Sequence, residues 1–184
     1  MKIHLGCWHR YFPDWVHVDL CDLPHIDYRT SVDKLPMFED QSADIIYASH
    51  VLEYFDRDAA KSALTEWARV LKPKGVLRLS VPDFEKLIKV YRQKNDLNSI
   101  LGPLYGKMKV PQTDGSTEIY HKMVFDEATL TQMLIGCGYF NPQRYDWRNT
   151  EHAQFDDHSQ AYYPHMDKKN GIAISLNIEA QKSW

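Results

Sequence analysis

One segment of the chain, residues 44–81, restricts the fold more than any other. Residues 44–48 (Asp-Ile-Ile-Tyr-Ala) form a nearly continuous apolar run, which is typical of a strand buried on both faces in the middle of a parallel sheet. Apolar side chains then recur at helical spacing from Ala60 to Leu71, and residues 76–81 (Val-Leu-Arg-Leu-Ser-Val) have the pattern of another strand. This order of strand, helix and strand predicts an α/β sandwich with a mostly parallel sheet.

The segments around this unit extend the alternation. Residues 2–5 and 15–18 have the pattern of two short strands, and the link between them is too short for a full helix. Asp83 opens a second predicted helix, and Asp126 is placed to cap a third. The alternation therefore continues well beyond the first unit.

The C-terminal half contains two predicted loops and a last strand. Glycine, proline and aspartate are frequent between residues 95 and 120, which predicts a loop with at most one helical turn and a candidate lid. Residues 152–170 are polar and aromatic and are expected to form a covering loop. Apolar and polar residues alternate near residues 171–180, which predicts a closing antiparallel strand with one buried face. We expect residues 1–184 to form a single domain.

Charge and cysteine content exclude several classes of protein. Lys and Arg number 22 against 25 Asp and Glu, so the net charge is −3 and no basic excess is available to bind nucleic acid. No apolar run approaches the ~20 residues of a membrane span. Cys7, Cys21 and Cys137 fit neither a disulfide framework nor a zinc site, so we expect reduced thiols in a cytoplasmic protein. A small molecule is the expected partner, and the sequence does not indicate an oligomeric state.

Chemically useful residues follow the predicted strands, at the edge of the sheet where α/β proteins bind ligands. Gly6 follows the first strand and lets the backbone approach a ligand. Asp19 follows the second strand and can accept hydrogen bonds from two ribose hydroxyls. Neither feature is specific, because a glycine after a strand is more often a plain turn.

Two histidines are candidate catalytic bases. His50 follows the central strand, and Glu53 comes three residues later, so the pair could share one face of a helical turn. His121 follows the candidate lid and could reach a substrate. The alternatives are a structural His50 beside a bracing Glu53, and a solvated loop histidine at 121. A metal bound by His50 and Glu53 is disfavoured, because two ligands do not make a site.

Five segments in the first half of the chain form a recognisable series: residues 2–7 (Lys-Ile-His-Leu-Gly-Cys), 15–19 (Trp-Val-His-Val-Asp), 35–36 (Leu-Pro), 44–53 (Asp-Ile-Ile-Tyr-Ala-Ser-His-Val-Leu-Glu) and 69–75 (Arg-Val-Leu-Lys-Pro-Lys-Gly). Together they resemble class I S-adenosylmethionine-dependent methyltransferases of the small methyltransferase-11-like group. Residues 159–161 and 175–180 also resemble segments of a predicted bacterial methyltransferase subgroup.

The resemblance implies a three-layer Rossmann-like sandwich whose mostly parallel sheet has a C-terminal antiparallel strand. It also implies S-adenosylmethionine as the cofactor, while the charge balance and aromatic loops favour a small polar metabolite or sugar-like methyl acceptor. The implied cofactor-binding residues are Gly6 and Cys7 at the methionine part, Asp19 at the ribose hydroxyls, Leu20 against the adenine, Ser31, Val32 and Asp33 at the adenine edge, and Ser49, with His50, facing the methyl group.

One residue departs from the family pattern. The family usually continues with glycine where this chain has Trp8, and an indole there could narrow or block the cofactor pocket. The alternative function is therefore a methyltransferase-fold protein that binds or regulates without catalysis. A nicotinamide-dependent enzyme is disfavoured, because the chain has no G-x-G-x-x-G motif.

Overall fold

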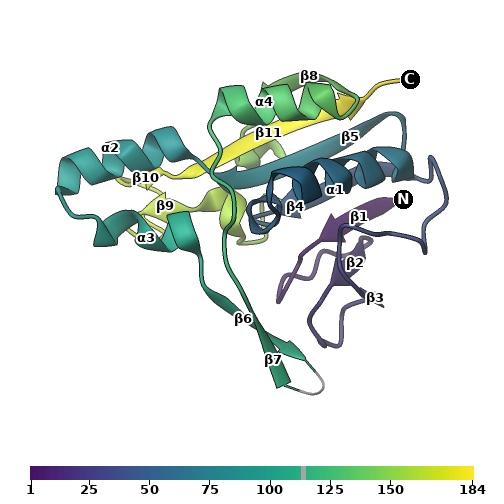
Figure 1. Ribbon diagram of the computed structural model, residues 1–184, viewed down its shortest axis with the longest axis horizontal. Coiled ribbons are helices and arrows are strands. Elements are labelled where there is room, and N and C mark those ends of the chain that lie inside the picture. Colours follow the sequence, from purple (N-terminus) through teal and green to yellow (C-terminus); the bar gives the residue numbers. More distant parts are fainter. Residues whose placement is uncertain (113–114) are drawn as a thin grey trace.

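A seven-stranded sheet runs through the molecule (Figure 1), and its strands, from one edge to the other, are β3 (Tyr28–Arg29), β2 (Val16–Asp19), β1 (Lys2–Leu5), β4 (Ala43–Ser49), β5 (Leu71–Pro82), β11 (Ser175–Lys182) and β8 (Tyr139–Arg144). This computed structural model describes residues 1–112 and 115–184, and side chains at 1–110 and 116–184. Strands β1 to β5 are parallel, and β11 is antiparallel to both of its neighbours. The predicted fold class is confirmed.

The central strand is the one that the apolar run predicted. Strand β4 pairs with β1 on one side and β5 on the other, both in parallel. Ile46 and Tyr47 are fully buried, although they point to opposite faces of the sheet. Both faces of this part of the sheet are therefore covered, as the continuous apolar run requires.

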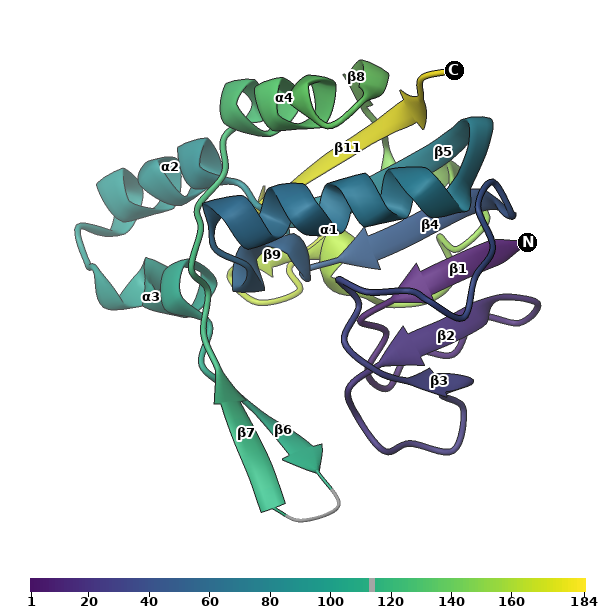
Figure 2. The ribbon, with the colours of Figure 1, turned by 45° about the vertical axis from the view of Figure 1, so that its right-hand side comes forward.

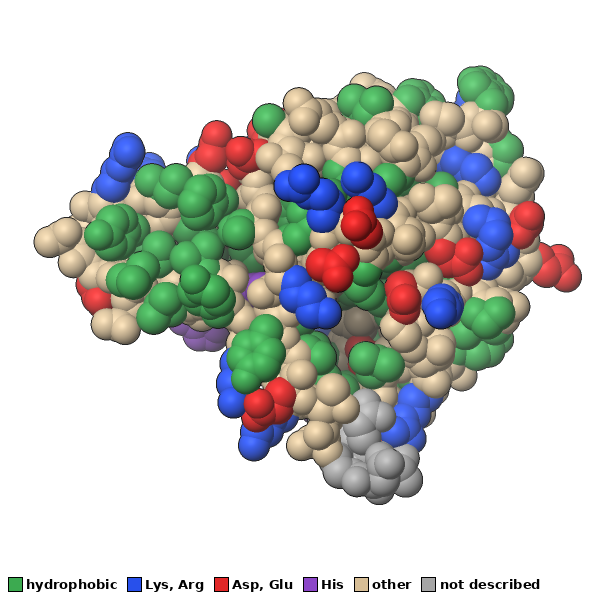
Figure 3. Space-filling model, viewed as in Figure 1, with side chains coloured by type: hydrophobic (Ala, Val, Ile, Leu, Met, Phe, Trp, Pro, Cys, Tyr) green, Lys and Arg blue, Asp and Glu red, His purple; other side chains and the backbone are tan. Residues whose placement is uncertain are grey.

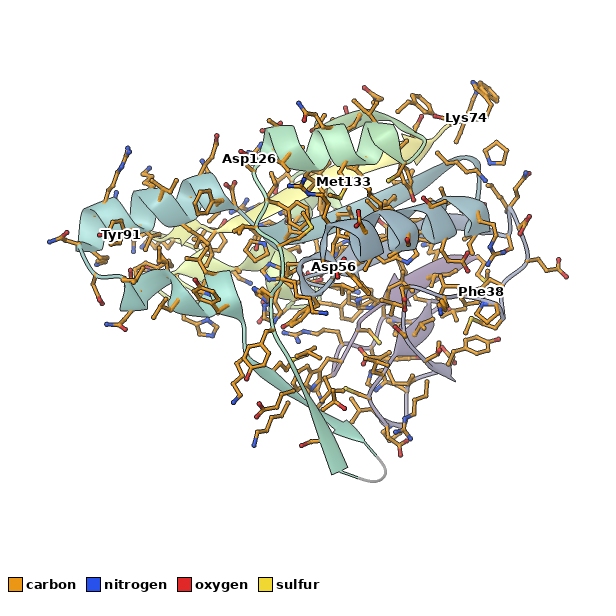
Figure 4. The ribbon with its side chains drawn as sticks, in the orientation of Figure 1. Phe38, Asp56, Lys74, Tyr91, Asp126 and Met133 are labelled. Atoms are coloured by element: carbon orange, nitrogen blue, oxygen red, sulfur yellow. The ribbon has the colours of Figure 1, made fainter. Side chains whose placement is uncertain are left out.

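Two helices cover one face of the sheet. Figures 1 and 2 show α1 (Arg57–Val70) and α4 (Glu127–Gly136) lying over the same side. Each begins at an aspartate cap: Asp56 accepts hydrogen bonds from the N–H groups of Asp58 and Ala59, and Asp126, the predicted cap, accepts one from Thr129. Figure 4 labels both aspartates at the starts of their helices. The caps set where the two helices begin, and the buried apolar residues of each helix pack it on the sheet.

Among the described residues no long helix covers the opposite face, which irregular chain covers instead. Phe12 and Trp15, in the link between β1 and β2, pack against Ile45 and Tyr47, and Phe155 adds to this cluster from the C-terminal half. The C-terminal part of this cover, called here the covering segment, comprises residues 147–173. It includes two single-turn helices, η2 (Trp147–Asn149) and η3 (His158–Gln160), and the short pair β9 (Tyr162–Tyr163) and β10 (Ile172–Ala173). Aromatic side chains thus replace a helical layer.

The prediction that the closing strand has one buried face is wrong. Ser175 and Asn177, on the polar side of β11, are 8% and 9% exposed. Asn177 Nδ2 donates a hydrogen bond to the carbonyl oxygen of Ser159, 2.9 Å away, in the covering segment. The polar side chains face a second layer of protein instead of solvent.

The prediction of a loop over residues 95–120 is also wrong. Helix α2 (Phe84–Lys94) is followed by a second helix, α3 (Asn98–Tyr105), and then by an antiparallel hairpin of β6 (Met108–Gln112) and β7 (Gly115–Ile119). Residues 113 and 114 of this predicted segment lie outside the described residues. Ile100 of α3 packs against Leu87 and Val90 of α2, so tertiary burial outweighs the nearby proline and glycines.

The hairpin and the α2–α3 pair extend from the body of the molecule. In Figures 1 and 2 the hairpin projects away from the sheet. Hydrophobic side chains gather over α2 and α3 in Figure 3, and the exposed ones on these helices and between them are Phe84, Tyr91, Leu97 and Tyr105. None of the helices in the described part of the chain is long and apolar enough to cross a membrane.

Candidate active site

A cavity of about 670 Å³ opens at the carboxyl ends of β1 and β4. Its wall includes Gly6, Cys7 and Trp8 after β1, Ser49 and His50 at the end of β4, and His121 beyond the hairpin. This volume is in the range that small-molecule sites occupy. The structure therefore brings three predicted site segments, distant in sequence, to one place.

Gly6 is required by packing as well as by its position beside the cavity. Its φ is +63°, and a Cβ at this position would collide with Cγ2 of Val51. The Gly6 N–H donates to the carbonyl oxygen of Val18, 2.8 Å away, which ties the end of β1 to β2. The sequence predicted that Gly6 lies beside the ligand site. The contact with Val51 that excludes a side chain is seen only in the structure.

Trp8 adopts a conformation that suits the glycine usual at this position. Its φ is +45°, in the left-handed region that bulky residues rarely adopt. Its N–H donates to Oδ2 of Asp19, 2.8 Å away, and its carbonyl oxygen lies 2.7 Å from Nε2 of His25. These two contacts hold the loop after β1, and the residue forms part of the cavity wall.

Asp19 connects the loops that follow β1 and β2. In addition to the bond from Trp8, Oδ1 accepts a hydrogen bond from the N–H of Cys21, 2.9 Å away. The side chain is largely buried, whereas neighbouring Leu20 is 36% exposed. Asp19 and Leu20 lie beyond the residues that line the cavity. The loop-tying role of Asp19 was not predicted from the sequence.

The three residues predicted at the adenine edge lie apart from the cavity. Ser31 Oγ donates a hydrogen bond to Oδ1 of Asp33. Val32 is buried, and its carbonyl oxygen accepts a bond from Nε1 of Trp67, 2.7 Å away. Asp33 lines a separate open depression beside α1, together with Lys61. These contacts give the segment structural partners on the helical face.

Ser49 places an unpaired polar group in the cavity wall. Its Oγ is buried and has no hydrogen-bond partner among the described residues. Buried hydroxyl groups normally have a partner, because desolvation without one costs free energy. An unsatisfied hydroxyl beside a cavity of this size suits a polar group on a bound ligand.

His50 stands at the end of β4 with both ring nitrogens near protein groups. Its φ is +54°. Nε2 lies 3.0 Å from Oγ of Ser175, and Nδ1 lies 3.3 Å from Oε1 of Glu53. Burial lowers the pKa of His50 well below its usual value, and His158 and His121 lower it further. The ring is therefore neutral near pH 7.

His121 and Glu53 complete the group. His121 Nδ1 lies 2.9 Å from the carbonyl oxygen of Pro103, and Nε2 lies 3.9 Å from Oε1 of Glu53. Burial lowers the pKa of His121 and raises the pKa of Glu53 to about 8. The sequence placed His50 near Glu53, but it contained no signal that His121 would join them from 68 residues beyond Glu53.

The cysteines and acidic side chains do not form a metal centre in the part of the chain that the structure describes. No group of three or more His, Cys, Asp or Glu side chains there is arranged to bind a metal ion. Cys7 and Cys21 are buried free thiols, and burial next to Asp19 raises the pKa of Cys21 to about 12. Such thiols are poor nucleophiles at neutral pH.

Comparison with known proteins agrees with this architecture. Residues 10–79 match the family described as a methyltransferase domain. A search of curated protein sequences gives no match. Similar solved structures are the S-adenosylmethionine-dependent methyltransferase of Methanosarcina mazei, with 17% identity and a TM-score of 0.60 over 99% of this chain and 92% of that one, and one from Mesorhizobium loti, with 14% identity and a TM-score of 0.54 over 98% and 90%.

A third similar structure contains ligands. It is the 1,6-didemethyltoxoflavin-N1-methyltransferase of Burkholderia thailandensis, with 1,6-didemethyltoxoflavin and S-adenosylhomocysteine bound. It shares 15% identity and a TM-score of 0.57 over 100% of this chain and 71% of that one. At these identities the structures show a shared fold. The domain match over residues 10–79 and the shared fold agree with the resemblance to class I S-adenosylmethionine-dependent methyltransferases that the sequence indicates.

Proposed function

We propose that this protein transfers a methyl group from S-adenosylmethionine to a small polar acceptor bound in the cavity. The observation that carries the proposal is the meeting of the β1 loop, the unpaired Ser49 hydroxyl and two neutral histidines at one cavity wall. The Burkholderia methyltransferase supports it, because that protein uses the same fold with a small molecule and S-adenosylhomocysteine bound.

The residues present fit the methionine end of the cofactor. Gly6 and Cys7 offer backbone groups at the cavity wall, and Ser49 Oγ is free to pair with a polar group. At the nucleoside end, Asp19 already accepts two backbone N–H groups, but a carboxylate has about four lone-pair sites. Asp19 would hold the ribose hydroxyls with the remaining sites, and Leu20 would lie against the adenine.

The adenine-edge assignment for Ser31, Val32 and Asp33 belongs to this proposal. These residues lie on the loop after β3, next along the sheet edge from Asp19. When bound, the cofactor supplies the methyl group already activated on its sulfonium. The protein then needs chiefly to place the acceptor in line and to exclude water.

The histidines would manage the proton that methylation of an O–H or N–H group releases. A neutral imidazole can accept that proton, and burial keeps both rings neutral. His121 is the better placed of the two, because its Nε2 has no hydrogen bond from a described residue. The nitrogens of His50 lie near Ser175 and Glu53 instead, so we assign His50 the role of orienting the acceptor in the site.

Two segments would enclose the acceptor. Gly106, Lys107 and Met108, where α3 meets the hairpin, line the cavity. His158 and Tyr162 line it from the covering segment. We therefore assign residues 95–120 as a lid and residues 152–170 as a cover of the acceptor site.

One observation favours a second candidate function, a binding protein without catalysis. The Trp8 N–H is bound to the proposed ribose carboxylate, and Trp8 also lines the cavity. If the indole excludes the cofactor, the fold would serve recognition alone.

Formation of S-adenosylhomocysteine from S-adenosylmethionine distinguishes the two functions. We expect product with at least one class of small hydroxylated or amino metabolite in a panel, and none with RNA or DNA. Product with nucleic acid alone would contradict the proposed acceptor class, and no product together with no cofactor binding would favour the non-catalytic function.

A further inference from the structure

A buried glutamate lies between the two histidines of the candidate active site. Glu53 is 0% exposed, and its Oε1 is 3.3 Å from Nδ1 of His50 and 3.9 Å from Nε2 of His121. Neither carboxyl oxygen accepts a hydrogen bond from a residue that the structure describes. An ionised carboxylate without donors is costly in a protein interior.

The backbone fixes this arrangement. The carbonyl oxygen of Glu53 accepts hydrogen bonds from the N–H groups of Lys122, 2.7 Å away, and Met123, 3.2 Å away. This contact places the segment after β7 directly against the turn after β4. The His121 ring also occupies the space that a side chain at Gly106 would need. The closeness of His121 to Glu53 is therefore built into the fold.

The hydrogen bonds of Ser175 determine where His50 carries its proton. Ser175 Oγ donates to the carbonyl oxygen of His158, since a carbonyl can only accept. Its single proton is then used, and Oγ must accept from Nε2 of His50. In a neutral ring this leaves the lone pair on Nδ1, the ring nitrogen that lies 3.3 Å from Oε1 of Glu53.

His121 also has an unprotonated ring nitrogen near Glu53, for a different reason. Its Nδ1 must donate to the carbonyl oxygen of Pro103, so in the neutral ring Nε2 is the lone pair. Two unprotonated imidazole nitrogens therefore lie 3.3 Å and 3.9 Å from one carboxyl oxygen. A proton on the carboxyl group removes the repulsion, because it can be donated to the nearer nitrogen, Nδ1 of His50.

The surrounding charges are consistent with this state. Burial is the largest cause that lowers the pKa of both rings, and His158 and Arg10 also lower that of His50. Tyr54 packs its ring edge on His121, and burial beside Glu53 raises the pKa of Tyr54 to about 12. No cation among these neighbours is placed to pair with Glu53.

We infer that Glu53 is a neutral carboxylic acid in the resting protein and donates a hydrogen bond to Nδ1 of His50, which holds the orientation of that ring in the tautomer that Ser175 sets. Glu53 is then a positioning residue that acts through His50. Its catalytic importance rests on the proposed function, whereas its protonation state does not.

Electrophoretic mobility tests the protonation state directly. At about pH 6.5 we expect Glu53→Gln to migrate with the wild type, because replacing a neutral acid by an amide changes no charge. The matched control Glu39→Gln, at an exposed position, should shift by one charge. At about pH 9.5 both variants should shift. If Glu53→Gln shifts as much as the control at the lower pH, the inference is wrong.

A measurement on the wild type covers the case in which Glu53→Gln fails to fold. With ¹³C-labelled glutamate, one side-chain carboxyl resonance should titrate near pH 8, far above the usual value of 4.5. Titration of every glutamate carboxyl near the usual value would overturn the inference. Neither measurement requires methyl transfer, so their failure is distinct from failure of the proposed function.

The positioning role has its own readout in the pH dependence of kcat/KM. Ionisation of Glu53 should reduce the wild-type value above about pH 8, and this alkaline decline should disappear in Glu53→Gln. The glutamine keeps an N–H that can be donated to Nδ1 of His50. The same decline in both proteins would show that Glu53 has no positioning role.

Discussion

Trp8 is placed to affect cofactor binding, because it forms part of the cavity wall and its N–H is bound to Asp19. If the indole packs against the cofactor, Trp8→Gly should weaken binding of S-adenosylhomocysteine by about threefold to tenfold, the usual value of one aromatic contact. Titration calorimetry measures this change. Tighter binding in Trp8→Gly would instead identify the indole as a plug and support the non-catalytic function.

The two histidines are expected to affect turnover more than cofactor binding. Replacing either His50 or His121 by glutamine should lower kcat by about 10²- to 10⁴-fold, the usual range for a lost proton acceptor or its support. Cofactor affinity, measured on the same samples, should remain nearly unchanged. Turnover close to that of the wild type in both variants would remove the histidines from the mechanism.

The position of a residue can be predicted where it ends or directly follows an apolar strand, whereas its role in binding stays a prediction. Gly6, Ser49 and His50 end strands with strong apolar patterns, and all three line the cavity. The loop-tying bonds of Asp19 and the proximity of His121 to Glu53 depend on contacts between distant segments. No local pattern encodes such contacts, so the sequence could not predict them.

Among the structural elements, the hairpin of β6 and β7 is the most separable. Its strands pair with each other and with no strand of the main sheet. Met108 and Ile119 are opposite each other, so a short Gly-Ser link can replace residues 108–119. We expect the melting temperature and cofactor affinity to change little, while KM for the acceptor rises. An unchanged KM would contradict the assignment of this segment to the lid.

Element prediction failed where tertiary contacts override local signals. Strand β8 has the sequence Tyr-Phe-Asn-Pro-Gln-Arg, which shows no apolar alternation, and it forms because an edge position beside β11 tolerates polar residues and a proline. The central strands and the helices capped by Asp83 and Asp126 were predictable, because burial pattern and cap chemistry agree there.

At the scale of the whole molecule, the face without a helical layer contains buried histidines. His4 and His152 are 2% and 1% exposed, and both stack on Phe12. Burial lowers the pKa of His4 and lowers that of His152 to about 4. In the unfolded chain both histidines bind a proton more readily than in the folded protein. The free energy of unfolding should therefore fall as the pH falls below about 6.5, by up to about 1.4 kcal/mol per pH unit for each histidine.

His152→Phe tests this origin of acid sensitivity. Neither ring nitrogen of His152 has a hydrogen-bond partner among the described residues, so phenylalanine can keep the stacking without losing a bond. The free energy of unfolding in urea, measured at about pH 7 and pH 5, should fall less in the variant than in the wild type. An equal fall in both proteins would exclude His152 as a cause.

The central claim is that the carboxyl edge of the sheet binds S-adenosylmethionine with its ribose at Asp19. Titration calorimetry with wild type and Asp19→Ala tests it most directly. We predict saturable binding to the wild type at a single site, weakened by about tenfold or more in Asp19→Ala, because hydrogen bonds to a charged group are lost. Equal affinity in both proteins, or no binding to the wild type at about millimolar cofactor, would contradict the account.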